Sequence, residues 1–410
     1  MVPSQLPGER PRLRLSYPVE LEAQESAREI PLVVGILGDF TNIPAADRPP
    51  LQDRRFVQLA AETIRETAAA RGPEDAVHRL LRLVELADAD PTIRVRALDV
   101  TKAELAVDLQ RAPSIDQSAL WKMIYDREYG TLGGEPYGMM LAAFSFTHGA
   151  TDVAMLENFA KIGADASCPF IAAASPRMLG SEQWEAFERP ERLDSLFTSK
   201  AYADWRALRD LDEARFVTLT AFNDALDTGA ALVEAYAKSG RWMDSGASAI
   251  DARTAVSDKA AVQALARHGI LAGSATRWEA CTVQRPRRYH QPERTAEAET
   301  MTRLSHVLTS AQFLRAVTCM LRDKIGTWRS MAEVESLLNG WIQNYVHDVD
   351  PTDNASFSES RPLSAAKLQL RDILGAPGQI KVTLDLRINL PDVEFAGVTR
   401  HAMRTVNVIL

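Results

Sequence analysis

Residues 30–37 of this 410-residue chain read Ile30-Pro-Leu-Val-Val-Gly-Ile-Leu37. A continuous apolar run of this length predicts a strand that is buried on both faces, as in a parallel sheet with helices on either side. Gly38 and Asp39 end the run. Ligand sites of α/β proteins often lie at the carboxyl end of such a strand, but an Asp that accepts backbone N–H bonds in a turn is the simpler interpretation of Asp39.

The segments that follow alternate between strand and helix patterns. A strand is expected at 93–100, a short strand at 144–146, a helix at 152–166 and a strand at 169–175. The last three are in β-α-β order, which predicts a parallel pair joined by a right-handed crossover. Thr101 and Glu104 have the spacing of a capping box. Further helices are expected at 54–71, 74–88, 182–212, 310–324 and 331–346, and final strands at 367–372, 380–390 and 405–410. Residues 225–270 are expected to be mostly helix, with breaks at Gly240 and Gly246. The predicted fold class is α/β, or mixed α+β.

Two long segments near the ends of the chain, 12–22 and 380–390, alternate strictly between apolar and polar residues. This period of two predicts half-buried strands. Neither has an obvious hairpin partner nearby, because the polar residues 23–29 are interpreted as a linker. Unpaired strand edges attract another chain, so both segments are expected to pair with neighbouring subunits. The predicted subunit interface consists of Leu13, Leu15, Tyr17, Val19, Leu21, Val382, Leu384, Leu386, Ile388, Val406 and Val408.

Composition argues against several classes of protein. The formal net charge is −8, so the basic footprint of a nucleic-acid-binding protein is absent. Three widely spaced cysteines form neither a disulfide framework nor a metal motif. The first residues have no apolar signal core, and no run of about 18 apolar residues could span a membrane. We expect a cytoplasmic protein with no membrane span, no nucleic-acid partner, no metal and no cofactor.

The stretch richest in glycine lies at 130–138. A phosphate-binding P-loop would end in GK[ST], whereas Glu135 puts a negative charge where phosphate would lie. A tight turn that brings two backbones close together is the preferred interpretation. Asp323 and Lys324 are expected to form an ion pair at a helix end. The residues assigned to structural motifs are Gly38, Asp39, Gly130, Gly133, Gly134, Glu135, Pro136, Tyr137, Gly138, Asp323, Lys324 and Trp341.

Catalytic patterns are weak. His148 and Asp152 could face each other near a strand end, and Ser145 and Ser175 could act as nucleophiles. The chain nevertheless has no G-x-S-x-G elbow and no H-E-x-x-H pair. A structural hydrogen bond is the simpler role for His148, and no catalytic residue is assigned.

Two parts of the chain resemble the sheath proteins of type VI secretion systems. Residues 32–40 and 50–57, with the strand before them, resemble the small sheath protein, called TssB or VipA. From about Leu98 the chain resembles the large sheath protein, called TssC or VipB. The matching stretches are 116–125, 128–138, 169–176, 203–206, 322–326 and 338–346. The chain looks like a short fused paralogue with contractile-tail-sheath-like domains and exchanged terminal β-strands.

The resemblance implies a division into four parts. These are a mobile N-terminus with an exchange strand at 1–27, a TssB-like segment at 28–72, a TssC-like core at 73–345 and C-terminal strands with an exchange arm at 346–410. The core would contain the middle and inner sheath domains. The family's outer domain has no counterpart, and with it is lost the helix that the disassembly ATPase ClpV recognises.

The resemblance also implies a structural function rather than catalysis. The expected partners are the chain itself in a ring or helical homo-oligomer, the main sheath proteins TssB and TssC, the Hcp inner tube and the baseplate. Without the outer domain, ClpV is not expected to recycle the subunit, which favours a baseplate-proximal or terminal ring. A bulk subunit of an unusual fused system is the alternative. An α/β enzyme using His148 and Asp39, or a module that caps sheath polymerisation, would be a different class of protein.

Overall fold

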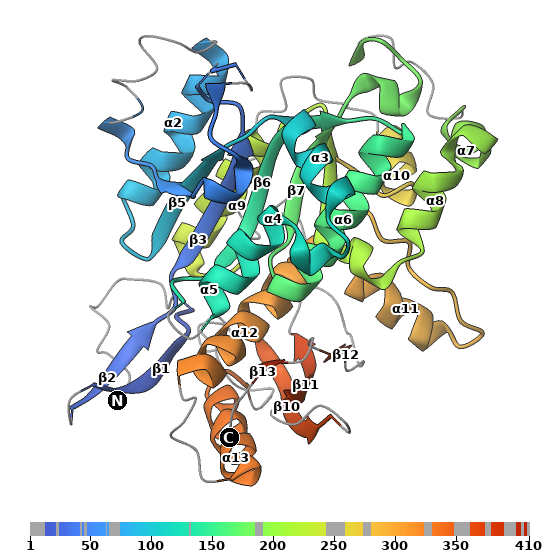
Figure 1. Ribbon diagram of the computed structural model, residues 1–410. Coiled ribbons are helices and arrows are strands. Elements are labelled where there is room, and N and C mark those ends of the chain that lie inside the picture. The colour runs from blue at the N-terminus through green and yellow to red at the C-terminus, as the bar shows by residue number, and fades with distance from the viewer. Residues whose placement is uncertain are drawn as a thin grey trace.

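The computed structural model describes residues 13–21, 24–41, 43–44, 47–62, 64, 74–130, 133–184, 192–242, 259–273, 280–323, 330–347, 361–373, 379–388, 399–402 and 406–407. At 18–27, 74–76, 259, 379, 399–402 and 406–407 only the backbone is described. Figure 1 shows a larger α/β part and, below it, a smaller part to which both ends of the chain contribute.

The larger part is built on one seven-stranded sheet. Its strands are β3 (Leu32–Gly38), β4 (Val57–Gln58), β5 (Ile93–Asp99), β6 (Tyr137–Phe146), β7 (Phe170–Ala174), β8 (Val217–Ala221) and β9 (Ile270–Ala272). The order is β4-β5-β3-β6-β7-β8-β9. All neighbours run parallel except β4, which is antiparallel to β5 at one edge. Every residue of β3 is buried, because the strand has a neighbour on each side and helices over both faces.

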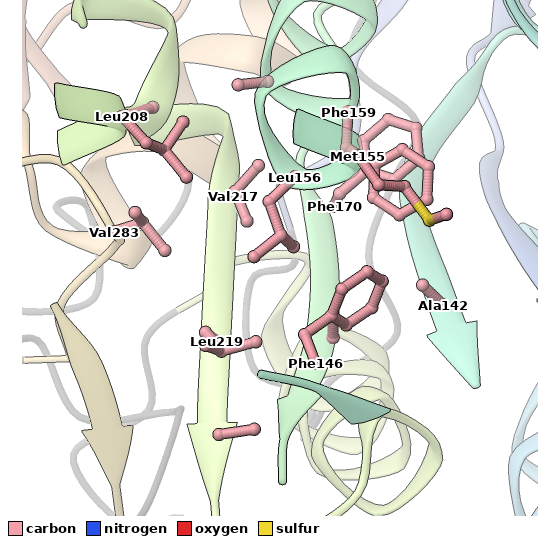
Figure 2. Packing of buried hydrophobic residues seen from close by; sticks show 14 of the residues in the cluster. Ala142, Phe146, Met155, Leu156, Phe159, Phe170, Leu208, Val217, Leu219 and Val283 are labelled. Carbon is pink, nitrogen blue, oxygen red and sulfur yellow. The ribbon is translucent and has the colours of Figure 1, made fainter. Parts of the chain in front are cut away.

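Helices cover both faces of this sheet. One face carries α3 (Lys102–Arg111), α4 (Ala119–Trp121), α6 (Ala150–Ala166), α7 (Leu193–Thr198), α8 (Ala203–Arg209) and α10 (Lys259–Arg267). In Figure 2, Phe159 of α6 lies against Phe170 of β7, with ring centroids 4.7 Å apart. The other face carries α2 (Glu74–Asp88), α9 (Ala225–Ser239) and the first turns of α12 (Leu304–Asp323). A π-helical turn at Lys122–Asp126 and α5 (Arg127–Tyr129) continue α4, and α11 spans Pro292–Met301.

The smaller part combines the last strands of the chain with its first. Strands β10 (Leu363–Asp372), β11 (Gln379–Ile388), β12 (Thr399–Ala402) and β13 (Val406–Asn407) form an antiparallel sheet, with β11 between β10 and the short pair β12 and β13. α13 (Met331–Gln343) lies against β10. The first described strands, β1 (Ser16–Leu21) and β2 (Gln24–Glu29), form an antiparallel hairpin. Among the helices that the structure describes, none combines the length and apolar character needed to cross a membrane.

The helix α12 joins the two parts. Every residue from Leu304 to Arg322 is buried. Leu304 and Leu308 pack with the face of the seven-stranded sheet that carries α2 and α9. The second half of the helix, from Phe313 to Leu321, packs with α13, β10 and β11. The helix was expected to be amphipathic and to begin near residue 310, but it starts earlier and is covered on all sides because it lies between two cores.

Several expectations are confirmed. The apolar run at 30–37 is a buried strand, although the strand is shifted by two residues at its start. The strands on either side of α6 are parallel. Thr101 and Glu104 form the expected capping box, in which the Thr101 side chain accepts the Glu104 N–H and the Glu104 side chain accepts the Thr101 N–H.

Other expectations were wrong. Residues 24–29 are not a linker but strand β2, so the first alternating segment does have a hairpin partner, held by main-chain bonds that polar side chains do not prevent. The helix expected from residue 54 is preceded by β4, because the edge of β5 offers main-chain pairing there. The strand expected at 144–146 is the end of ten-residue β6, whose many small residues hid its pattern. The stretch 225–270 forms α9 and α10, and the break expected at Gly240 is confirmed, because Gly240 ends α9 with φ 70°. The break expected at Gly246 lies outside the described residues.

Candidate assembly interface

The N-terminal residues 13–17, called the arm from here on, lie in the smaller part of the molecule. Leu13, Leu15 and Tyr17 are each 2% exposed and belong to one apolar cluster with α12, α13, β10 and β11. The Leu13 N–H donates to the carbonyl of Ser239, at the end of α9, at 2.9 Å. The alternation seen in the sequence therefore places one face of the arm in the core of its own chain.

Two aromatic side chains bind the main chain of the arm. Trp341 Nε1 donates to the Ser16 carbonyl at 2.8 Å, across 325 positions of sequence. The Tyr345 hydroxyl accepts the Ser16 N–H at 3.2 Å and lies 3.2 Å from the Arg14 carbonyl, to which it donates. Burial raises the pKa of Tyr345, so the hydroxyl keeps its proton for this bond. The main-chain groups of Ser16 and the Arg14 carbonyl are thus bound by side chains, without a neighbouring strand on this side.

Asp323, at the end of α12, is the charged contact of this region. Its Oδ2 accepts from the Tyr17 hydroxyl at 2.5 Å and from Arg28 of β2 at 2.9 Å, and its Oδ1 accepts from Arg322 at 2.7 Å. Burial raises the pKa of Tyr17, and the bond to Asp323 raises it further. Burial opposes ionisation of Asp323, but the bonds from Arg322 and Tyr17 leave its pKa below the usual range. The expected partner Lys324 lies outside the described residues.

The predicted interface residues of the C-terminal segment lie in the same cluster as the arm. They are Val382, Leu384, Leu386 and Ile388 on β11, all of them buried. Since β11 has partners on both sides within the chain, it is not an unpaired edge in this structure. The side chains of Val19, Leu21 and Val406 are outside the described part of the chain, as is Val408.

The outer edge of β10 is occupied by polar side chains of α13. Asn339 donates to the Leu368 carbonyl and accepts the Leu368 N–H, both at 2.9 Å. One turn on either side, Glu335 accepts the Leu370 N–H at 2.8 Å and Gln343 donates to the Ala366 carbonyl at 2.9 Å. The helical spacing of four residues matches the strand spacing of two, so these side chains take the place of a neighbouring strand.

The glycine-rich loop 130–138 leads from α5 into β6. The Gly133 N–H donates to the Gly130 carbonyl at 2.7 Å, and a Cβ at Gly133 would overlap the carbonyl of Glu128. Glu135 binds Arg96 of β5 at 2.9 Å. The Glu135 carboxylate thus forms an ion pair within the protein.

The end of this loop packs against two other segments. Pro136, Tyr137 and Gly138 are buried. A Cβ at Gly138 would collide with Leu32 of β3 and with the guanidinium of Arg315 of α12. Glycine at this position therefore lets β3, β6 and α12 approach one another closely.

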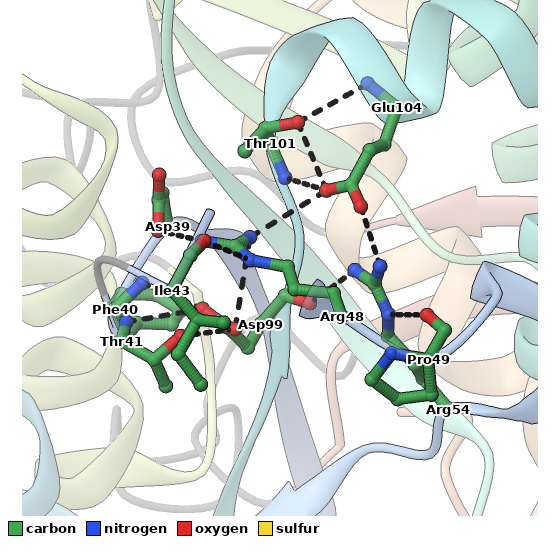
Figure 3. A network of polar contacts seen from close by, with 10 residues as sticks. All are labelled: Asp39, Phe40, Thr41, Ile43, Arg48, Pro49, Arg54, Asp99, Thr101 and Glu104. Carbon is green, nitrogen blue, oxygen red and sulfur yellow. Dashed lines mark hydrogen bonds and ion pairs between the residues drawn. The ribbon is translucent and has the colours of Figure 1, made fainter. Parts of the chain in front are cut away.

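A network of charged residues surrounds the carboxyl end of β3 (Figure 3). The side chain of Arg48 is 2% exposed and lies 2.5 Å from Asp39, 3.5 Å from Glu104 and 3.7 Å from Asp99. Arg54 binds the other oxygen of Glu104 at 2.5 Å. The bond from Arg54, aided by those from Thr101, lowers the pKa of Glu104 to about 2.

The role expected for Asp39 falls to a different residue. Asp99, at the end of β5, accepts the N–H groups of Phe40 and Thr41 at 2.8 and 3.2 Å. Asp39 instead pairs with Arg48. Gly38 ends β3, and a Cβ there would meet the ring of Phe40.

His148 and Asp152, considered above as catalytic candidates, bind structural partners. The ring of His148 stacks on Tyr202 with centroids 4.3 Å apart, and its Nδ1 lies 3.2 Å from the Arg177 carbonyl. Asp152 accepts the Thr147 N–H at 2.7 Å. These side chains stabilise the turn between β6 and α6.

Sequence reasoning missed most of the polar residues that hold these contacts. They are Arg28, Arg48, Arg54, Asp99, Arg322, Glu335, Asn339, Gln343 and Tyr345. A usable signal existed for the α13 side chains, because Glu335, Asn339 and Gln343 recur every four residues along one side of its apolar face.

Three family models match this chain. The model described as "Type VI secretion system, VipA, VC_A0107 or Hcp2" matches residues 7–78. The models "EvpB/VC_A0108, tail sheath N-terminal domain" and "EvpB/VC_A0108, tail sheath gpW/gp25-like domain", both of the VipB family, match residues 69–224 and 293–401, together more than half of the chain. The chain belongs to the type VI secretion sheath family. Its fused VipA-like and VipB-like organisation is thereby confirmed.

A relative supports the same assignment. The type VI secretion system sheath protein TssC1 of Pseudomonas aeruginosa is 29% identical over 394 residues, which cover 80% of this chain and 78% of that protein. Sheath proteins of this family are structural subunits of oligomeric assemblies and not enzymes, so the enzyme alternative falls away.

The matches show that several contacts described above join the VipA-like part of the chain to the VipB-like part. We call the contact between the VipA-like residues 7–78 and the VipB-like remainder the seam. Three sets of contacts form the seam. The arm packs on α12 and α13, and β3 pairs with β5 and β6. Arg48 and Arg54 bind Glu104. In this sheath protein, the contact between the two family segments therefore lies inside a single chain.

Proposed function

We propose that the chain is a subunit of a type VI contractile sheath in the bacterial cytoplasm, and that it joins neighbouring copies by exchanging the arm. The observation that carries the proposal is the binding of the arm to α12 and α13, more than 300 positions away in sequence. An identical arm from a neighbour can make the same apolar contacts and the same bonds to Trp341, Tyr345 and Asp323. Exchange of an identical element links subunits at low cost because no contact is lost.

The hairpin supplies the length for exchange. Residues 18–31 connect the arm to β3 and contain β2 and most of β1. A lone two-stranded hairpin is only marginally stable. Opened to an extended chain, these residues would span about 45 Å, which is about twice the radius of gyration of roughly 22 Å expected for a chain of this length. The arm can therefore reach an adjacent subunit without unfolding either core.

The polar side chains of α13 make the arm a better candidate than β10 for the element that connects neighbouring subunits. Because Glu335, Asn339 and Gln343 occupy the outer edge of β10, a strand could be added there only if α13 moved away. The arm, in contrast, needs only the hairpin to open. The C-terminal interface residues then act as the receiving surface for the arm.

We further propose a specialised position in the apparatus. The VipA-like and VipB-like matches overlap at 69–78. No residues therefore lie between the two matches that could form further helices of the small protein. The outer sheath layer that ClpV would engage has no counterpart there. The subunit would surround the Hcp tube together with the main sheath proteins, in a ring near the baseplate or at the terminus, and would not be recycled by ClpV.

Deletion of residues 1–22 tests arm exchange, with deletion of residues 1–11 as the matched control that leaves the arm intact. Negative-stain electron microscopy of the purified protein should show rings or tubes for the wild type and the control, and single subunits for the longer deletion. Unchanged assembly after the longer deletion would refute arm exchange.

Two further measurements test the position and the recycling. Quantitative mass spectrometry of isolated sheaths should find a few copies of this chain for many copies of the main sheath proteins. A copy number equal to theirs would support the alternative, a bulk sheath subunit. Purified ClpV should leave the assembled chain in the pellet after sedimentation with ATP, and extraction of the chain would refute the recycling proposal.

A further inference from the structure

We propose that this chain has no vacancy for a separate VipA-like protein. Its own residues 7–78 fill that place, so the unit that enters an assembly is one polypeptide. The proposal deepens the sheath function above, but it concerns the seam within a single subunit and does not depend on arm exchange.

The central position of β3 is the first argument. β3 pairs with β5 from Leu32 to Gly38 and with β6 from Val33 to Leu37. Both neighbours lie in the VipB-like match, and β3 lies in the VipA-like match. A strand inside a sheet has no free main-chain edge, so a competing strand must displace it completely rather than add beside it.

The next strand along the VipA-like segment closes the adjoining edge. β4 pairs Val57 with Ala97 and Gln58 with Arg96 of β5, and the Leu59 N–H extends the pairing to the Val95 carbonyl at 2.9 Å. β5 therefore has a VipA-like strand on each side. A second VipA-like chain finds neither the central position nor this edge open.

The segment is also fixed beyond its strands. Between β3 and β4, the buried Arg48 and its neighbour Arg54 bind carboxylates that include Glu104 of α3. Before β3, Tyr17 of the arm binds Asp323 of α12. A competitor must therefore displace three separated sets of contacts.

Covalent connection gives the chain's own segment a further advantage. Residues 59–92 of the same chain, which include α2, connect β4 to β5, so the segment is held near its site. An element tethered in this way has an effective concentration on the order of 1 mM. A free competitor of equal affinity at about 1 μM would then occupy roughly one site in a thousand.

A co-refolding experiment tests the proposal. The probe is a fluorescent polypeptide of residues 1–78 of this chain, which has the matched sequence and so equal contacts. Full-length chain and probe are unfolded together, refolded at about 1 μM each and analysed by native mass spectrometry. The wild type should retain the probe in well under one chain in a hundred. Retention near one in ten or above would overturn the proposal.

A variant of the full chain provides the positive control. Val34→Asp combined with Ile36→Asp places two carboxylates on the side of β3 that packs against α2 and α9. With its own strand disabled, the refolded variant should take up the probe at least about a hundredfold more than the wild type. A folded variant that takes up no probe would contradict the proposal.

A second measurement covers the case in which the variant does not fold. Hydrogen exchange is measured on the amides of β3 and β6 in the wild-type chain, refolded with and without the probe. Both strands should be equally protected, and the probe should change neither. A loss of β3 protection in the presence of the probe would overturn the proposal. Loss of sheath assembly with these results unchanged would count against the sheath function instead.

Discussion

Arg48→Met tests whether the network at the end of β3 stabilises the seam. Methionine preserves the apolar stem of the buried side chain but removes its bonds to Asp39, Asp99 and Glu104 and to the Ile43 carbonyl. Glu104 keeps Arg54, and the side chain of Asp39 is 40% exposed, so neither becomes a fully uncompensated charge. We therefore expect a local loss of about 2–3 kcal/mol, at or below the lower end of the range for breaking a fully buried ion pair.

Hydrogen exchange of the native protein is the appropriate assay, because a chain of this size need not unfold in two states. The informative amides are those of Phe40 and Thr41, which bind Asp99, and of Leu59, which pairs with β5. At 1.4 kcal/mol per tenfold change, the expected loss makes them exchange roughly 30- to 140-fold faster. Arg55→Met is the matched control. Arg55 is exposed in the same segment, and its replacement should change exchange by less than about threefold. Equal exchange in the two variants would refute the reasoning.

Four other predictions follow from the same structure. Lowering the pH from 4.5 to 2 should remove up to about 3 kcal/mol of stability, because the pKa of Glu104 is about 2 in the folded chain. The stabilisation from a lowered carboxyl pKa is fully present above the unfolded pKa and is lost as the pH falls toward the folded pKa. Glu104→Gln should flatten this part of the acid unfolding curve. Tyr17→Phe keeps the burial of the arm but removes its bond to Asp323, so limited proteolysis within residues 13–21 should accelerate, in line with a cost of about 1–2 kcal/mol. In urea unfolding, Gly133→Ala should destabilise the chain by about 1–3 kcal/mol, because the new Cβ meets a backbone carbonyl. Gly340→Ala in α13 should instead stabilise the chain by up to about 1 kcal/mol, because the Cβ there meets nothing within 4 Å. Asn339→Leu should expose the edge of β10 and raise light scattering on storage, while Asn344→Leu, just past α13, should not.

Local features of this fold could be predicted from the sequence. The buried strand at 30–37, the capping box at Thr101 and the β-α-β unit around α6 each depend on residues close together in the chain. Hydrophobic period, caps and turn residues carry this kind of information. The family motifs also identified both halves of the fused sheath protein.

The contacts of the seam could not be predicted in the same way. Tyr17 and Asp323 are separated by 306 positions, and nothing in either neighbourhood indicates the other. The sequence of strand β2 has no apolar alternation that would indicate a strand, and the element is recognised by its main-chain pairing with β1. The alternating pattern of β11 predicted a strand with one buried face, but period alone could not reveal that its partners come from the same chain.

The buried helix α12 has a mechanical consequence. Its 20 residues span about 30 Å and run from the core of the large sheet to the cluster that holds the arm. A pull on the arm is transmitted by Tyr17 to Asp323 at one end of this helix, and the opposite end is fixed among Leu304, Leu308 and the large sheet. The helix can therefore carry tension and torque as a rigid strut. In the arm-exchanged assembly proposed above, displacement of one subunit would turn its neighbour as a solid body, while the hairpin of β1 and β2 would absorb the remaining strain.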